Sequence, residues 1–130
     1  MFTLSTAGET SRSLRGISKR VLVVDDEPLI RWALSVGLSA AGFDTIAAAN
    51  ATEARRLAQA YPQPDTVLLD LHQDGCASLL ADLRAALPCG HFLVLGTCCD
   101  GDPTPRWQGL DIIPKPFDLA DVIDRISDIH

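Results

Sequence analysis

Two adjacent acids, Asp25 and Asp26, directly follow the apolar run VLVV at 21–24. Neighbouring carboxylates at the end of a buried strand repel each other, and a hard divalent cation with oxygen ligands relieves that repulsion. A third acid, Asp70, ends a second apolar run, VLL at 67–69. These three positions predict a site for a divalent cation.

Two further polar side chains also follow apolar runs. Thr97 comes after FLVLG at 92–96, and Lys115 comes after DIIP at 111–114. In an open parallel sheet the carboxyl ends of the strands share one edge, where ligands bind, so we expect the acids, Thr97 and Lys115 to converge. The acids would hold Mg²⁺, while the hydroxyl and the ammonium would contact the oxygens of a phosphoryl group.

The elements that must position these residues follow from hydrophobic periodicity. Short apolar runs predict five strands, at 21–24, 45–48, 66–69, 92–95 and 111–113, and their continuous apolar character is typical of burial on both faces. Helical spacing between the runs predicts four buried stripes: Ile30, Ala33, Leu34, Gly37, Leu38 and Ala41; Ala54, Leu57, Ala58 and Tyr61; Leu79, Leu80, Leu83, Ala86 and Leu87; Leu119, Val122, Ile123 and Ile126. The alternation predicts an α/β fold with a doubly wound, five-stranded parallel sheet and helices on both faces.

Residues that start or stop helices support these assignments. Pro28 suits a first helical turn, and Gly42 suits a left-handed cap at the end of the same helix. Asn50, with Glu53 three residues later, predicts the start of the second helix. Asp118 is expected to cap the last one.

Length and composition indicate one globular domain. The chain has 130 residues, of which 47% are hydrophobic and 22% charged, and its formal net charge is −6. We expect a flexible tail at 1–19 and a folded domain at 20–130. The sequence has no run of membrane length and no secretory signal, so we expect a cytoplasmic protein with reduced cysteines and no contact with a membrane. The negative charge argues against direct nucleic acid binding.

The segments VLVVDDEP at 21–28, VLLD at 67–70, Thr97 after FLVLG, and KPF at 115–117 resemble the CheY-like receiver domains of bacterial two-component response regulators. The resemblance extends from Arg20 to about Ile129, and DDEPLIRWAL at 25–34 is most similar to receivers of the nitrogen-regulation type. It implies the flavodoxin-like receiver fold. It also implies a signalling protein that accepts a phosphoryl group from a sensor histidine kinase or a phosphotransfer protein.

The resemblance assigns a role to each site residue. Asp70 would be the phosphoacceptor, and Asp26, Asp70 and the backbone carbonyl of His72 would bind Mg²⁺, with Asp25 holding metal-bound water. Lys115 would pair with Asp70 and then with the phosphoryl group, and Thr97 would hydrogen-bond a phosphoryl oxygen. Pro116 would follow Lys115 through a cis peptide bond. The added negative charge would bias two conformations of the domain.

Three departures from the family pattern limit what is carried over. The loop after Asp70 is shorter than usual and contains His72 and Asp74. Glycines and prolines in CCDGDPTPRWQGL at 98–110 predict that the fourth helix is short or missing. Ile112 stands where the family usually has an aromatic residue, for which Trp107 could substitute, although packing against the domain is the more common role of such a tryptophan.

The cysteines leave two interpretations open. Cys76, Cys98 and Cys99 lie with His72 in the loops expected near the site, where they could bind Zn²⁺ or respond to oxidation. The vicinal pair lacks the usual C-x₂-C spacing, however, and free cysteines are commonly just small buried residues.

Two functions from different classes therefore remain. The first is a receiver that switches on phosphorylation; no enzyme activity is expected beyond Mg²⁺-dependent self-phosphorylation and self-dephosphorylation. The second is a receiver-like protein-interaction module that no longer switches. Because the sequence ends at His130, soon after the last predicted helix, we expect a single-domain regulator with a downstream protein partner that the sequence does not identify. A homodimer is one assembly that the resemblance allows.

Overall fold

The computed structural model describes residues 19–60, 62–70, 76–95, 110–113 and 117–129. Residues 1–18 of the tail expected at 1–19 lie outside these ranges, as do residues 96–109, which include most of the segment where the fourth helix is expected to be short or missing. Among the helices within these ranges, none has the length and apolar character needed to span a membrane.

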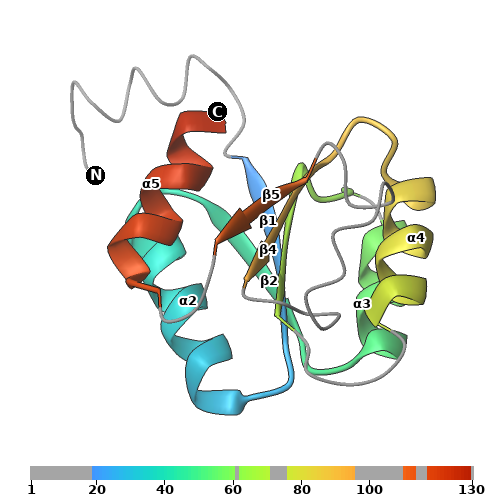
Figure 1. Ribbon diagram of the computed structural model, residues 1–130, viewed down its shortest axis with the longest axis horizontal. Helices are drawn as coiled ribbons and strands as arrows, with labels where there is room; N and C mark the ends of the chain where they lie inside the picture. The colour runs from blue at the N-terminus through green and yellow to red at the C-terminus, as the bar shows by residue number, and fades with distance from the viewer. Residues whose placement is uncertain (1–18, 61, 71–75, 96–109, 114–116, 130) are drawn as a thin grey trace, which may run out of the picture.

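A five-stranded sheet forms the centre of the molecule (Figure 1). The strands are β1 Arg20–Asp25, β2 Asp44–Ala48, β3 Thr66–Asp70, β4 His91–Leu95 and β5 Asp111–Ile113. Their order in the sheet is β2-β1-β3-β4-β5, and every neighbouring pair is parallel. This confirms the doubly wound parallel sheet, and the five predicted runs match the observed strands to within one residue at either end.

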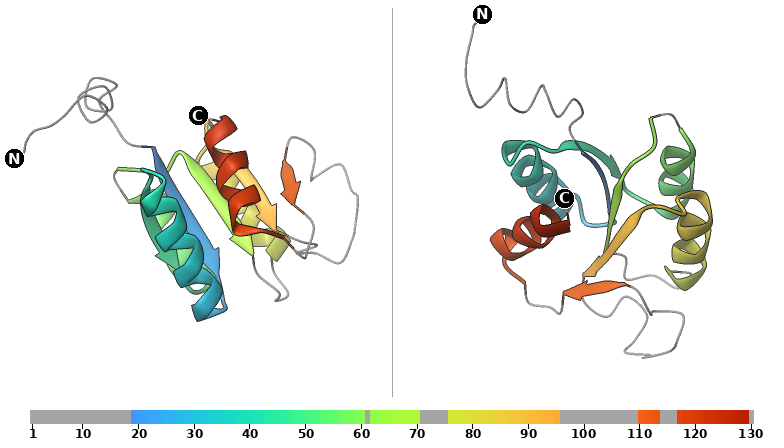
Figure 2. Two further views of the ribbon diagram at one scale, coloured as in Figure 1. Left: turned by 90° about the vertical axis from the view of Figure 1, so that its left-hand side faces the viewer. Right: turned by 90° about the horizontal axis from the view of Figure 1, so that it is seen from above.

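The described helices lie on both faces of the sheet, as the view from above in Figure 2 shows most clearly. The described helices are α2 Pro28–Ala40, α3 Ala51–Gln59, α4 Cys76–Ala86 and α5 Leu119–Ile129. Helices α2 and α5 lie on one face, and α3 and α4 lie on the other.

The side chains of β1 alternate between two separate cores. Val21 and Val23 pack with residues of α2 and α5, whereas Leu22 and Val24 pack with residues of α3 and α4. All four are fully buried, which explains why β1 reads as a continuous apolar run rather than as an alternating one.

The helix ends largely follow the expected signals. Gly42 has a φ of 101°, the left-handed conformation that ends a helix without strain at glycine. The Asn50 side chain accepts a hydrogen bond of 2.8 Å from the Glu53 N–H, as expected of an N-cap. At the start of α5, the main-chain carbonyl of Asp118 accepts a bond from the Asp121 N–H.

One residue of the predicted stripes is misplaced. Ala41 was expected on the buried stripe of the first helix, but it lies just beyond the last residue of α2 and is exposed. The chain turns away from the core there, because the left-handed Gly42 follows directly. Tyr61, expected on the next stripe, lies outside the described residues.

Candidate functional site

Asp25 and Asp70 lie side by side at the carboxyl ends of β1 and β3. They are register partners in the parallel ladder that joins these strands, and their side chains are only 0% and 1% exposed. Asp26 follows directly and is half-buried. Two carboxylates thus meet at the edge of the sheet where ligands of open α/β folds bind.

Asp25 is held by two hydrogen bonds from the start of α2. Its Oδ1 atom accepts a bond of 2.9 Å from the Glu27 N–H, and its main-chain carbonyl accepts one of 2.8 Å from Nη1 of Arg31. Its other carboxylate oxygen, Oδ2, is buried and has no hydrogen-bond partner among the residues that the structure describes. Within the described part of the chain, this oxygen is therefore the one of Asp25 that a ligand could take.

The surroundings of Asp25 disfavour its ionised form. Burial raises the pKa of its carboxyl from the ordinary 3.8 to about 7, and the neighbouring acids Asp70 and Asp26 add to the effect. The hydrogen bond from the Glu27 N–H acts in the opposite direction, because it favours the carboxylate. A cation beside these acids would stabilise the charged forms.

The described residues fit one end of a cation site but do not complete it. A buried carboxylate oxygen with no partner in the described structure, next to a second carboxylate, is a donor set suited to a hard divalent ion such as Mg²⁺. Within the described ranges, however, no group of three or more His, Cys, Asp or Glu side chains could hold a metal ion. A complete site would need further ligands from residues outside these ranges. The backbone carbonyl of His72 is one such expected ligand.

Several predicted site residues lie outside the described ranges. They are His72, Thr97, Lys115, Pro116, Cys98 and Cys99. Their convergence with Asp70 stays a prediction, as do the Zn²⁺ and oxidation interpretations of the cysteines. Cys76 is the first residue of α4.

Arg31 is a site residue that the sequence analysis did not single out. It lies in the first turn of α2, six residues after Asp25, and its side chain reaches back to the end of β1. The signal that could have identified it is an arginine one helical turn after an acid pair, where a guanidinium can reach main-chain carbonyls of the preceding strand.

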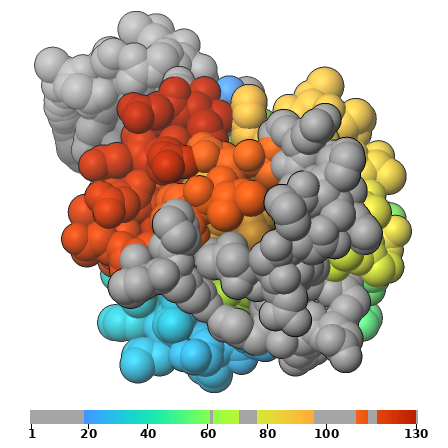
Figure 3. Space-filling view, in the orientation of Figure 1, coloured from blue at the N-terminus to red at the C-terminus, as the bar shows by residue number. Residues whose placement is uncertain are grey.

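The same helix carries three exposed apolar side chains. Leu29, Trp32 and Val36 are 74%, 63% and 47% exposed, and their spacing places them along one face of α2. In the space-filling view, α2 lies at the lower left of the molecule, below α5 (Figure 3). This apolar row begins four residues after Asp25.

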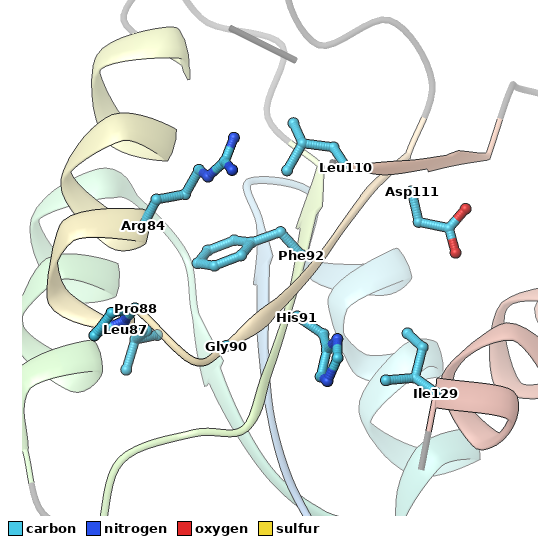
Figure 4. A pocket seen from close by; sticks show the side chains of 9 residues that line it. All are labelled: Arg84, Leu87, Pro88, Gly90, His91, Phe92, Leu110, Asp111 and Ile129. Carbon is cyan, nitrogen blue, oxygen red and sulfur yellow. The ribbon is translucent and has the colours of Figure 1, made fainter. Parts of the chain in front are cut away.

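A cavity of about 380 Å³ lies at the opposite edge of the sheet, around the amino ends of β4 and β5 (Figure 4). It is lined by Arg84, Leu87, Pro88, Gly90, His91, Phe92, Leu110, Asp111 and Ile129. Asp111 at its rim is paired with Arg125 of α5. Because Asp25 and Asp70 end their strands at the other edge, this cavity is not part of the acid site.

Comparison with known proteins places the chain among response regulators. It is 33% identical over 119 residues to the DNA-binding transcriptional regulator RpaA of Synechocystis, covering 82% of this chain and 47% of RpaA. It is 34% identical over 113 residues to the transcriptional regulatory protein KdpE of Mycobacterium tuberculosis, covering 82% of this chain and 48% of KdpE. It is 32% identical over 118 residues to NtrC of Escherichia coli, covering 87% of this chain and 24% of NtrC. The chain thus spans about half or less of the length of these relatives, and no family model matches it.

Solved structures show the same fold. A response regulator from Thermotoga maritima superposes with a TM-score of 0.72 at 27% identity, covering 87% of this chain and 98% of that one. A response regulator from Burkholderia pseudomallei, solved with a phosphorylated aspartic acid, a calcium ion and citrate, superposes with a TM-score of 0.70 at 26% identity, covering 86% of this chain and 71% of that one.

Three findings indicate the same family. They are the parallel strand order β2-β1-β3-β4-β5, the paired acids at the ends of β1 and β3, and the similarity to response regulators in sequence and in structure. The chain belongs to the CheY-like receiver domains of response regulators.

Proposed function

We propose that this receiver accepts a phosphoryl group on Asp70 from a histidine kinase or a phosphotransfer protein, in a reaction that depends on Mg²⁺. The observation that carries the proposal is the burial of Asp70 beside Asp25 at the carboxyl ends of adjacent strands. The phosphorylated aspartic acid of the Burkholderia response regulator supports the same chemistry at the level of the family.

The transfer needs a carboxylate nucleophile and compensation of negative charge. An oxygen of Asp70 would attack the phosphorus of a phosphohistidine, the P–N bond would break, and an acyl phosphate would form. Mg²⁺, when bound, would neutralise charge on the phosphoryl oxygens. Asp25 is held by Glu27 and Arg31, so its buried Oδ2 atom keeps a fixed position beside the nucleophile.

The apolar row of Leu29, Trp32 and Val36 is suited to be a docking surface for the protein that donates the phosphoryl group. The row is exposed and begins four residues after Asp25, so a helix of the donor could cover it while its phosphohistidine reaches Asp70. Burial of large apolar side chains is a typical source of docking affinity.

Intact-mass measurement after incubation with acetyl phosphate and Mg²⁺ tests the proposal. We expect a phosphate adduct on the unaltered protein, none on Asp70→Asn, and none when Mg²⁺ is chelated. Asp82→Asn is the matched control, because Asp82 is an exposed acid of α4 that pairs only with surface Arg55 among the contacts described here. An adduct that persists on Asp70→Asn would show that another residue accepts the group.

One observation favours the second candidate, an interaction module without a switch. Ile112 is 44% exposed on the edge strand β5, where the resemblance led us to expect an aromatic residue that moves on phosphorylation. Absence of an adduct with acetyl phosphate and with phosphorylated protein donors would support this module instead.

A further inference from the structure

We infer that Arg31 is a positioning residue of the acid site, which fixes the acid pair through the main chain and thereby strengthens Mg²⁺ binding. The inference rests on the proposed Mg²⁺ site and concerns a residue to which neither the sequence pattern nor the comparisons give a role.

Three hydrogen bonds join Asp25, Glu27 and Arg31 into a closed set. The Arg31 guanidinium donates to the carbonyl of Asp25 at 2.8 Å, the Glu27 N–H donates to Oδ1 of Asp25 at 2.9 Å, and the Arg31 N–H donates to the carbonyl of Glu27 at 2.9 Å. The turn that carries Asp26 is therefore held at both ends.

The bond from Arg31 acts on the peptide that joins the two acids. The carbonyl of Asp25 belongs to the peptide unit whose nitrogen is that of Asp26, and this unit is planar. Fixing the carbonyl therefore fixes the direction in which the chain enters Asp26. A charge-assisted hydrogen bond of this length, half-buried, is strong enough to hold that orientation.

The choice of a main-chain oxygen matters for metal binding. An arginine bonded to the carboxylates would compete with a cation for the same oxygens. Arg31 instead takes a carbonyl, so this bond uses none of the carboxylate oxygens that a cation needs. Groups that orient metal ligands without touching the metal commonly change its affinity by about tenfold or more.

The electrostatic effect and the positioning effect of Arg31 predict opposite changes in Mg²⁺ affinity when Arg31 is removed. Arg31 is a cation whose guanidinium bonds the main chain of Asp25, so its simple electrostatic effect is to repel Mg²⁺, and its loss would tighten binding. If Arg31 positions the acid pair, its loss weakens binding. The direction of the change therefore separates the two effects.

The test measures the Mg²⁺ dissociation constant of the unphosphorylated protein by isothermal titration calorimetry at fixed pH. We expect Arg31→Met to weaken binding about tenfold. Arg31→Lys, which keeps a donor and the charge on a stem of similar length, should recover most of the affinity. The control Arg56→Met removes a solvent-exposed arginine of α3 and should leave the constant unchanged.

The outcomes are distinguishable. Unchanged or tighter binding by Arg31→Met would overturn the positioning role and leave the proposed function intact. Failure of the unaltered protein to bind Mg²⁺ in the millimolar range would overturn the metal dependence of the proposed function and this inference with it. If Arg31→Met does not fold, Arg31→Gln, which keeps a donor but not the charge or the full reach, decides the question: weaker binding supports the role, and unchanged or tighter binding overturns it.

Discussion

The raised pKa of Asp25 contributes to the pH dependence of stability in the protein without metal. Burial raises this pKa to about 7, whereas the unfolded chain has the ordinary value of 3.8, so the folded state binds the proton more tightly. The stabilisation from protonated Asp25 is complete below pH 3.8 and is lost as the pH rises through 7. We expect the free energy of unfolding, measured by urea titration with a chelator present, to fall between pH 4 and pH 7.5 by at most about 4 kcal/mol from this group.

Substitution of Asp25 isolates that contribution. Asp25→Asn should remove this part of the pH dependence and make the chelated protein more stable than the unaltered one at pH 7.5. Asp124→Asn, which changes an exposed acid of α5, is the control and should keep the fall. Added Mg²⁺ should raise the melting temperature more at pH 8 than at pH 5.5, because protons and the cation compete for the acids. A stability that is flat with pH in the chelated protein would contradict the raised pKa.

The sequence predicted some of these residues and not others. Asp25 and Asp70 were predicted together because each ends an apolar run, and parallel strands bring such ends to one edge. Arg31 was not, because its contact depends on the path of a long side chain between a helix and a strand. The sequence also did not show which oxygen of Asp25 accepts a hydrogen bond, because this depends on where the Glu27 N–H points.

At the scale of elements, the contact between α2 and α5 depends on a small residue. A Cβ atom at Gly37 would lie 3.1 Å from side-chain atoms of both Leu119 and Ile123. These atoms are ends of flexible side chains, so alanine can be accommodated, and its higher helix propensity offsets the crowding. A leucine cannot be, because the gap between the helices is already filled.

We therefore expect Gly37→Leu to lower the free energy of unfolding by roughly 2 kcal/mol. Gly37→Ala should change it by less than about 1 kcal/mol. Ala40→Leu, at an exposed position of the same helix, is the matched control and should have little effect. Denaturant unfolding of the three variants checks this, and equal stabilities of Gly37→Leu and Ala40→Leu would contradict the close packing of α2 on α5.

Most elements were predictable because each agrees with a strong local signal. The buried runs, the helical stripes, the N-cap at Asn50 and the left-handed Gly42 all point to the observed boundaries. Ala41 was assigned wrongly because it continues the helical spacing for one more residue, and spacing alone does not show where a helix ends. The partners of Arg20 were not predicted either. Its side chain bonds Asp44 and the Pro62 carbonyl near the amino ends of the strands, and residues so far apart in the sequence meet only in the folded chain.

At the scale of the whole molecule, the exposed row of Leu29, Trp32 and Val36 provides a test of donor docking. Substitution of Leu29 and Trp32 by alanine should leave phosphorylation by acetyl phosphate unchanged, because the acids are untouched. Phosphoryl transfer to this double variant should be slower by about tenfold or more, for any histidine kinase that phosphorylates the unaltered protein. Measurement of both rates by intact mass separates docking from chemistry.

Two results would count against that docking face. Equal slowing with acetyl phosphate would mean that the substitutions disturb the acid site itself. Unchanged transfer from the kinase would place the donor elsewhere. Ile112→Ala, which removes an exposed apolar side chain from β5 rather than α2, is the matched control and should leave both rates unchanged.

The burial of β1 on both faces affects how its register with the neighbouring strands is determined. Every side chain at 21–24 is apolar, so shifting the strand by one residue would exchange the two cores at little hydrophobic cost. A shift that brings Asp26 opposite Asp70 would also move Asp25 one place back, opposite Leu69, into the apolar interior. A shift in the other direction would bring the charged Arg20 opposite the buried Thr66. Burial of a further unpaired carboxylate costs several kcal/mol. The acids therefore also mark where the strand must stop, and the residues proposed for phosphoryl transfer double as the reference point that keeps the central sheet in register.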